Sequence, residues 1–163
     1  MMSESNTTVR KSISVPVPQA AAFALFTERL GDFKPAEHNL LSVPIAETVL
    51  EPRVGGAIVD RGTDGSECRW ARVLVFDRPD RIIFSWDISP TWRIETDPEH
   101  TSEVEIRFIV DGDSSTRVEL EHRHLDRHGP GWESVRDGVG GDGGWPVYLE
   151  RYRELVGSVD VSS

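Results

Sequence analysis

The sequence is poor in several features that would assign it to a specialised class of protein. Its 163 residues include a single cysteine, Cys68, so no disulfide can form within the chain and a reducing compartment is expected. No apolar run approaches the ~18 residues of a membrane-spanning helix. Residues 1–8 are polar and lack the apolar core of a signal peptide. We therefore expect a cytoplasmic protein with no membrane insertion.

Positive charge is also scarce. Lys and Arg total 18 against 28 Asp and Glu, which gives a net charge of −10 and a pI near 4.9. Nucleic acids and acidic membranes need a basic face, so no nucleic-acid partner is expected. The length suits one domain. We expect a disordered tail over 1–8, a single domain over 9–158 and a short tail over 159–163, with a second copy of the chain as a candidate partner.

The spacing of apolar residues predicts an α+β fold. Alternation predicts a first strand over 9–17, and the next residues, from Pro18 to Leu30, have helical spacing. From Ile45 the period becomes two. Six further strands are expected, over 45–50, 57–60, 68–76, 81–87, 103–110 and 116–124. Turns rich in Gly and Asp separate them, which favours an antiparallel meander.

The C-terminal segment has the pattern of a long helix that covers this sheet. Its apolar residues recur at helical spacing: Trp145, Tyr148, Leu149, Tyr152, Leu155 and Val156. The glycine-rich stretch 138–144 before it is expected to be a flexible loop. Val104, Ile106 and Phe108 alternate with charged residues, so one sheet face is predicted to be covered and the other wet. A curved antiparallel sheet of about six or seven strands, wrapped around the C-terminal helix, would leave a cavity between the two.

Several short stretches, in this order, resemble one known superfamily. They are Phe26-Thr-Glu-Arg-Leu-Gly-Asp-Phe, Leu50-Glu-Pro-Arg-Val-Gly-Gly, Asp77-Arg-Pro-Asp-Arg-Ile-Ile-Phe-Ser-Trp, Ser102-Glu-Val-Glu-Ile-Arg-Phe, Thr116-Arg-Val-Glu-Leu-Glu-His and Gly143-Gly-Trp-Pro-Val-Tyr-Leu-Glu-Arg. The set resembles the SRPBCC, START-like superfamily that includes the birch-pollen allergen. Within it, the chain resembles bacterial single-domain relatives of the activator of the heat-shock-protein-90 ATPase. The resemblance implies a helix-grip fold, with one or two short helices after the first strand and a lipophilic cavity, but no particular reaction.

Two departures from the family pattern concern the cavity. Phe33-Lys34 stands where the family usually has a tryptophan pair, which predicts a smaller pocket edge. Glu37 and His38 follow, in the irregular stretch that covers the cavity mouth in relatives. The usual His-x-Gly at the end of a strand is here His122-Arg-His124, which adds an imidazole.

The histidines allow two interpretations. Residues two apart on a strand face the same way, so His122 and His124 could reach one metal, with His128 or Glu121 as a third ligand. Alternatively, His122 is a polar group that lines the cavity and His124 sits at the rim of the sheet. Two histidines without a fixed third ligand are a weak signal, so no metal and no other cofactor is predicted.

The five tryptophans are more than typical composition gives. About half are expected in the core, and the others are expected to line a pocket for flat apolar ligands. The predicted ligand-binding wall is Phe33, Trp70, Phe84, Trp86, Phe108, Leu120, His122, Trp145 and Tyr148, with no residue assigned as catalytic.

Three functions remain open from the sequence. The leading one is binding of a hydrophobic small molecule, such as a lipid, a polyketide or an aromatic metabolite. The second is a cyclase or aromatase, in which His122, His124 and Arg72 would polarise carbonyls. Arg72 alternates with Trp70 and would face inward, unless a bulge reverses it. The third is a co-chaperone-like interaction module.

Overall fold

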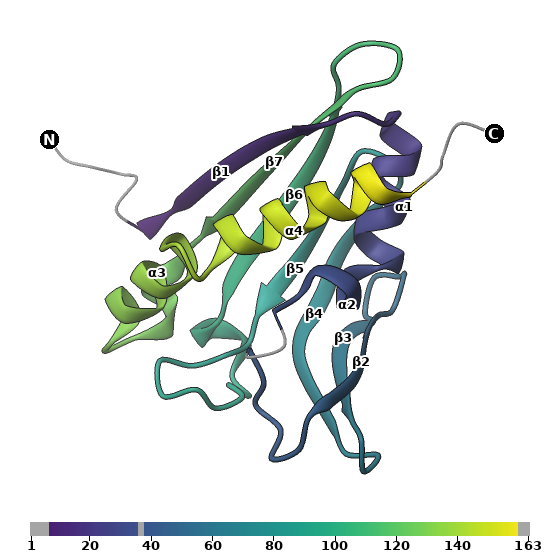
Figure 1. Cartoon of the computed structure of the whole chain (residues 1–163). Helices are drawn as coiled ribbons and strands as arrows, with labels where there is room; N and C mark the ends of the chain where they lie inside the picture. The colour runs from purple at the N-terminus through teal and green to yellow at the C-terminus, as the bar shows by residue number, and fades with distance from the viewer. Residues whose placement is uncertain (1–6, 36–37, 160–163) are drawn as a thin grey trace, which may run out of the picture.

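The computed structural model describes residues 7–35 and 38–159, and shows one curved sheet with helices on its concave side (Figure 1). The strands are β1 Val9–Val15, β2 Ile45–Leu50, β3 Ala57–Gly62, β4 Glu67–Asp77, β5 Arg81–Trp86, β6 Ser102–Val110 and β7 Thr116–Arg123. The helices are α1 Gln19–Glu28, α2 Leu30–Phe33, α3 Trp132–Gly140 and α4 Trp145–Ser158, with short 3-10 helices η2 Pro98–His100 and η3 Leu125–His128. The expected tails, 1–8 and 159–163, lie mostly outside the described residues.

The seven strands form a single antiparallel sheet in the order β1-β7-β6-β5-β4-β3-β2. Helices α1 and α2 connect the two edge strands, β1 and β2, and α4 runs across the hollow of the sheet (Figure 1). The predicted helix-grip fold is therefore confirmed. No helix within the described part of the chain is long and apolar enough to cross a membrane.

The alternation in β6 explains how the sheet holds α4. Val104, Ile106 and Phe108 are at most 2% exposed and form part of one core with the apolar side of the helix. Tyr152 of α4 is fully buried there, and its hydroxyl donates a 2.7 Å hydrogen bond to the carbonyl of Ala22 in α1. This bond satisfies a polar group that burial would otherwise leave without a partner.

The outer face of the sheet is less wet than its charges suggested. Glu105 is only 2% exposed, because the side chains of Arg81, Arg107 and Arg123 lie over it. Burial acts to raise the pKa of Glu105, but hydrogen bonds from the three guanidinium groups outweigh burial and lower the pKa to about 2. This carboxylate therefore stays ionised while nearly covered.

The glycine-rich stretch is not the long loop that its composition predicted. Helix α3 extends to Gly140, so the connection to α4 is limited to residues 141–144. Val135 and Val139, four residues apart, pack against the core and hold this helix in spite of its glycines. A side chain at Gly144 would lie 2.2 Å from the Val139 carbonyl oxygen, so only glycine fits where α3 meets α4.

A bulge settles which way β4 faces. Ile58 of β3 pairs with Ala71, but the next residue, Val59, pairs with Arg69, so Trp70 is an extra residue in β4. Trp70 and Ala71 are consequently both buried. Of the two orientations left open for Arg72, the structure therefore has the one that a bulge produces: its side chain is 40% exposed and pairs with Asp87.

Candidate functional site

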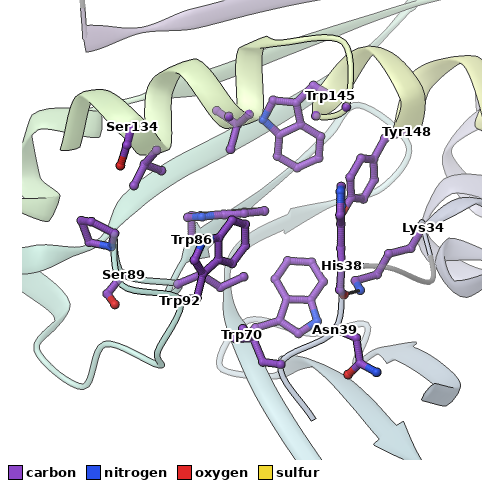
Figure 2. Close-up of a pocket in the computed structure, with 18 of the residues that line it drawn as sticks. Lys34, His38, Asn39, Trp70, Trp86, Ser89, Trp92, Ser134, Trp145 and Tyr148 are labelled. Atoms are coloured by element: carbon purple, nitrogen blue, oxygen red, sulfur yellow. Dashed lines mark hydrogen bonds between the residues drawn. The ribbon is translucent and has the colours of Figure 1, made fainter. Parts of the chain in front are cut away.

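A cavity of about 480 Å³ opens beside the N-terminal end of α4. Four of the five tryptophans line it, and each comes from a different part of the fold: Trp70 from β4, Trp86 from the end of β5, Trp92 from the loop after β5, and Trp145 from the start of α4. Tyr148, one turn further along α4, completes the aromatic wall (Figure 2). This volume lies within the range typical of small-molecule sites.

The aromatic rings contact one another in a continuous series. The ring centroids of Trp70 and Trp86 are 5.5 Å apart, those of Trp86 and Trp145 are 5.4 Å apart, and those of Trp145 and Tyr148 are 4.9 Å apart. Tilted and edge-to-face contacts of this kind stabilise aromatic clusters. All four residues are at most 6% exposed, whereas Trp92 is 64% exposed at the mouth. The inner wall is therefore fixed before any ligand arrives.

Behind this wall lies a hydrogen-bonded chain of four residues, which we call the closed histidine cluster: Trp145, His122, Ser102 and His128. The indole Nε1 of Trp145 donates to His122 Nδ1 at 3.0 Å. His122 Nε2 lies 2.7 Å from the Ser102 hydroxyl, which lies 2.8 Å from His128 Nε2. Trp145 is thus anchored from behind by two strands and η3.

The direction of each hydrogen bond follows from the first one. An indole N–H can only donate, so His122 Nδ1 accepts and its proton sits on Nε2. The Ser102 hydroxyl then accepts from His122 and donates to His128. Burial, and secondarily the nearby His128, lowers the pKa of His122 to about 3, so its imidazole is neutral at physiological pH. Burial also lowers the pKa of His128.

A second polar group lines the cavity itself, and we call it the charged end: Lys34, Asp60, His38 and Tyr148. Figure 2 shows Lys34, His38 and Tyr148 on the same side of the cavity. Lys34 Nζ lies 3.2 Å from Asp60 Oδ2, with side chains only 5% and 3% exposed. The ammonium also donates to the carbonyl oxygen of His38. His38 Nδ1 lies 3.1 Å from the Tyr148 hydroxyl. The described polar contacts therefore join the segment after α2 to β3 and α4.

The structure divides the predicted wall into two groups. Trp70, Trp86, Trp145 and Tyr148 line the cavity, whereas Phe33, Phe84, Phe108, Leu120 and His122 do not. Phe33 packs against Phe26 and Tyr152, with centroids 5.1 and 5.2 Å apart. These rings fill the space between the sheet and the C-terminal half of α4, so the cavity is confined to the N-terminal end of the helix. His122 lies behind Trp145, with both ring nitrogens engaged.

The residues proposed to polarise carbonyls do not reach the cavity. His124 has a left-handed backbone, with φ of 61°, and leaves the strand before η3, so it does not face the same way as His122. Arg72 does not line the cavity, and its partly exposed guanidinium pairs with Asp87. Among residues 7–35 and 38–159, no three His, Cys, Asp or Glu side chains are grouped so that they could hold a metal ion.

The cavity residues that sequence reasoning missed include Lys34, Asp60 and Trp92. Lys34 was noted only as the loss of a tryptophan. Asp60 interrupts the apolar run Ala57-Ile-Val, and a lone carboxylate after such a run is a usable signal of a buried ion pair. Trp92 lies in a loop without periodicity, so the sequence contains no comparable signal for it. His38 was placed at the mouth by resemblance, while its neighbour Glu37 lies outside the described residues.

Comparison with solved structures finds similar proteins that are named for different roles. An anthrahydroquino-gamma-pyrone synthase, Txn09, is 35% identical, with 91% of this chain and 96% of that chain covered and a TM-score of 0.65. CalC, a self-sacrificing resistance protein from Micromonospora echinospora, is 26% identical, with coverage of 97% and 99% and a TM-score of 0.67. An Hsp90 activator from Plasmodium falciparum, at 18% identity, coverage of 93% and 96% and a TM-score of 0.57, shares the fold.

Comparison with curated proteins finds no match. Comparison with family models matches residues 16–157 to the family described as Activator of Hsp90 ATPase homolog 1-like protein. That segment contains all the strands after β1, all four helices apart from the last residue of α4, and every residue that lines the cavity. The chain therefore belongs to the Activator of Hsp90 ATPase homolog 1-like family.

Proposed function

We propose that this protein binds a flat, hydrophobic aromatic molecule of the polyketide type in the tryptophan-lined cavity. The observation that carries the proposal is the wall itself, in which four indole rings and Tyr148 surround about 480 Å³. Rigid aromatic walls favour planar ring systems, because they offer a large contact area at a low cost in side-chain entropy. A flexible lipid chain would gain less from such fixed rings.

One of the similar proteins favours the same class of ligand. The 35% identical synthase is named for a fused aromatic ring product, and its similarity extends over nearly the whole of both chains. In this family the fold commonly binds hydrophobic ligands, so the aromatic wall is what narrows the choice from hydrophobic molecules in general to planar ones.

Intrinsic fluorescence offers a direct test, since four of the five tryptophans line the cavity. Titration with anthraquinone should quench the emission saturably, with a micromolar dissociation constant. The variant His124→Ala, outside the cavity, should titrate like the wild type, and palmitate should compete poorly with anthraquinone. Absence of saturable quenching by anthraquinone, or stronger binding of palmitate, would refute the proposal.

A second candidate is a ring-closing enzyme that acts on such a molecule. It is favoured by the identity to a synthase and by the ionisable groups of the charged end, which line the cavity. Native mass spectrometry of the freshly purified protein would reveal a co-purified compound. If that compound, supplied in excess, is recovered with its mass, retention time and fragmentation unchanged, the protein is a binder. Recovery of a ring-closed product, either an isomer of the same mass or a compound lighter by one water, would identify a cyclase.

A further inference from the structure

The charged end contains more polarity than apolar binding requires. Burying Lys34 and Asp60 costs solvation energy, and a buried ion pair of this kind can often be replaced by apolar residues without loss of stability. The other carboxylate oxygen of Asp60, Oδ1, accepts a 2.7 Å hydrogen bond from the Thr48 hydroxyl, and this bond holds the ion pair in place. A fixed charge pair in a cavity wall provides a strong local field with which to recognise a polar ligand group.

Lys34 has a donor left for such a group. An ammonium carries three N–H bonds. Two of them have acceptors, the Asp60 carboxylate and the His38 carbonyl, and the third has no oxygen or nitrogen acceptor in the part of the chain that the structure describes. Lys34 Nζ lies 5.7 Å from the centroid of the Trp70 ring, so this donor is beside the aromatic wall.

Trp70 supplies an independent second observation. Its indole Nε1–H is buried and has no hydrogen-bond acceptor among the described residues. Figure 2 shows the nitrogen edge of Trp70 on the side where Lys34 and His38 lie. A buried donor without an acceptor is unfavourable, and an oxygen atom of a ligand would relieve it.

We propose that the ligand carries an acidic hydroxyl, a phenol or enol, whose oxygen is held at the charged end as a hydrogen-bonded phenolate or enolate. Lys34 Nζ and Trp70 Nε1 donate to this oxygen while the fused rings lie against the tryptophan wall, and the hydroxyl proton leaves to solvent. This inference rests on the proposed function and specifies its ligand.

The number of donors favours a phenol over a carboxylic acid. The site offers two donors, Lys34 Nζ and Trp70 Nε1. A phenolate and a carboxylate both bring one negative charge close to Asp60, but a phenolate carries that charge on a single oxygen, which these two donors can satisfy. The second oxygen of a carboxylate would need further donors.

Four anthraquinone probes test the assignment: unsubstituted anthraquinone, 2-hydroxyanthraquinone, 2-methoxyanthraquinone and anthraquinone-2-carboxylate. The hydroxy compound should bind about tenfold more tightly than the unsubstituted and methoxy compounds, because a hydrogen bond to a charged group is worth at least that much. At a pH where the free probe is un-ionised, binding should produce the long-wavelength absorption band of its phenolate.

The variant Lys34→Met removes the charge and keeps the length of the side chain. It should abolish the phenolate band and bring the affinity ratio of hydroxy to methoxy compound close to one. The control is Lys11→Met, because Lys11 is the only other lysine in the chain and lies on β1, away from the cavity. This variant should keep both the phenolate band and the preference for the hydroxy compound. If Lys34→Met does not fold, Lys34→Met with Asp60→Asn leaves no unpaired charge and should give the same result.

Equal binding of the hydroxy and methoxy compounds, a band that persists in the Lys34 variants, or tightest binding of the carboxylate would each overturn the inference. These results leave the proposed function standing as long as anthraquinone itself binds. If none of the four probes binds, the proposed function fails, and this inference fails with it.

Discussion

The closed histidine cluster and the charged end both contain a histidine and both bond to α4, yet they are built differently. In the closed cluster, both ring nitrogens of His122 have partners, and the imidazole is kept neutral behind Trp145. The charged end faces the cavity, and its ion pair retains a donor without an acceptor among the described residues. Of the two, only the charged end offers such an atom to the cavity, because the atom of the closed cluster without a described partner, His128 Nδ1, belongs to a residue that does not line the cavity.

The comparison shows that the type of a polar residue says less about its role than the state of its hydrogen bonds. In the sequence, the pair His122 and His124 suggested a metal site or a catalytic group at His122. Lys34, which stands where the family usually has a tryptophan, did not suggest a binding role. Buried polar atoms whose hydrogen bonds are all made within the protein stabilise the fold. Buried polar atoms that lack a hydrogen-bond partner in a cavity wall are available to bind a ligand. The predictions that follow set the two groups against each other.

The largest expected difference concerns stability. His122→Ala leaves the Trp145 indole and the Ser102 hydroxyl without their shared partner and opens a void, which should cost about 3–5 kcal/mol. Thermal unfolding should then occur about 10 °C lower. His38→Ala in the charged end loses the 3.1 Å contact to the Tyr148 hydroxyl and the contact between the two rings, and should cost about 1 kcal/mol. Equal losses in the two variants would contradict the distinction.

The next difference appears on acidification. The pKa of His122 is lowered from 6.5 to about 3 in the folded state, so below pH 6.5 the unfolded chain binds a proton that the folded chain does not. Stability should therefore fall by about 2 kcal/mol between pH 6.5 and about pH 5. Glu105 does not contribute in this range, because its lowered pKa weakens the fold only below pH 4.5.

Denaturant titrations of the wild type and of His122→Gln would measure this dependence. The glutamine keeps a donor and an acceptor but does not titrate, so its stability should change less over the same pH range. A wild-type stability that stays level down to pH 5 would show that His122 takes up a proton without opening the cluster.

A smaller effect is expected on ligand binding. Trp145 belongs to both the aromatic wall and the closed cluster, so Trp145→Ala should weaken anthraquinone binding by about tenfold. Trp145→Phe keeps a ring but loses the N–H bond to His122, and should weaken binding by only about threefold, through poorer positioning. Calorimetric titration with anthraquinone would measure the dissociation constants of the wild type and of the two variants. Identical affinities for the alanine variant and the wild type would remove Trp145 from the ligand wall.

The sequence was sufficient for the fold because the fold depends on alternation and turn chemistry. The β6 residues Val104, Ile106 and Phe108 are buried as their pattern predicted, and α4 begins at Trp145 as expected. The loop predicted over 138–144 was too long, because α3 extends to Gly140. Tertiary packing of Val135 and Val139 outweighs the low helix propensity of glycine there.

The site was less predictable, because it depends on contacts between residues distant in sequence. The bulge at Trp70 turns Arg72 away, whereas the sequence of β4 left both orientations of Arg72 open and did not place a bulge at Trp70. The pairing of Lys34 with Asp60 joins residues on either side of β2. Whether His122 faces the ligand or stands behind Trp145 depends on a ring orientation that strand periodicity does not specify.

The smallest expected effect is on metal addition. Zinc binds neutral imidazole through a ring nitrogen with a free lone pair. In the closed cluster, Nδ1 of His122 accepts from Trp145 and Nε2 carries the proton donated to Ser102, so zinc would have to break a buried hydrogen bond before it gained a ligand. Zinc or a chelator should therefore leave the unfolding temperature unchanged. A chelator-induced drop of several degrees that disappears in His122→Ala would show that the cluster opens to a metal and is not closed.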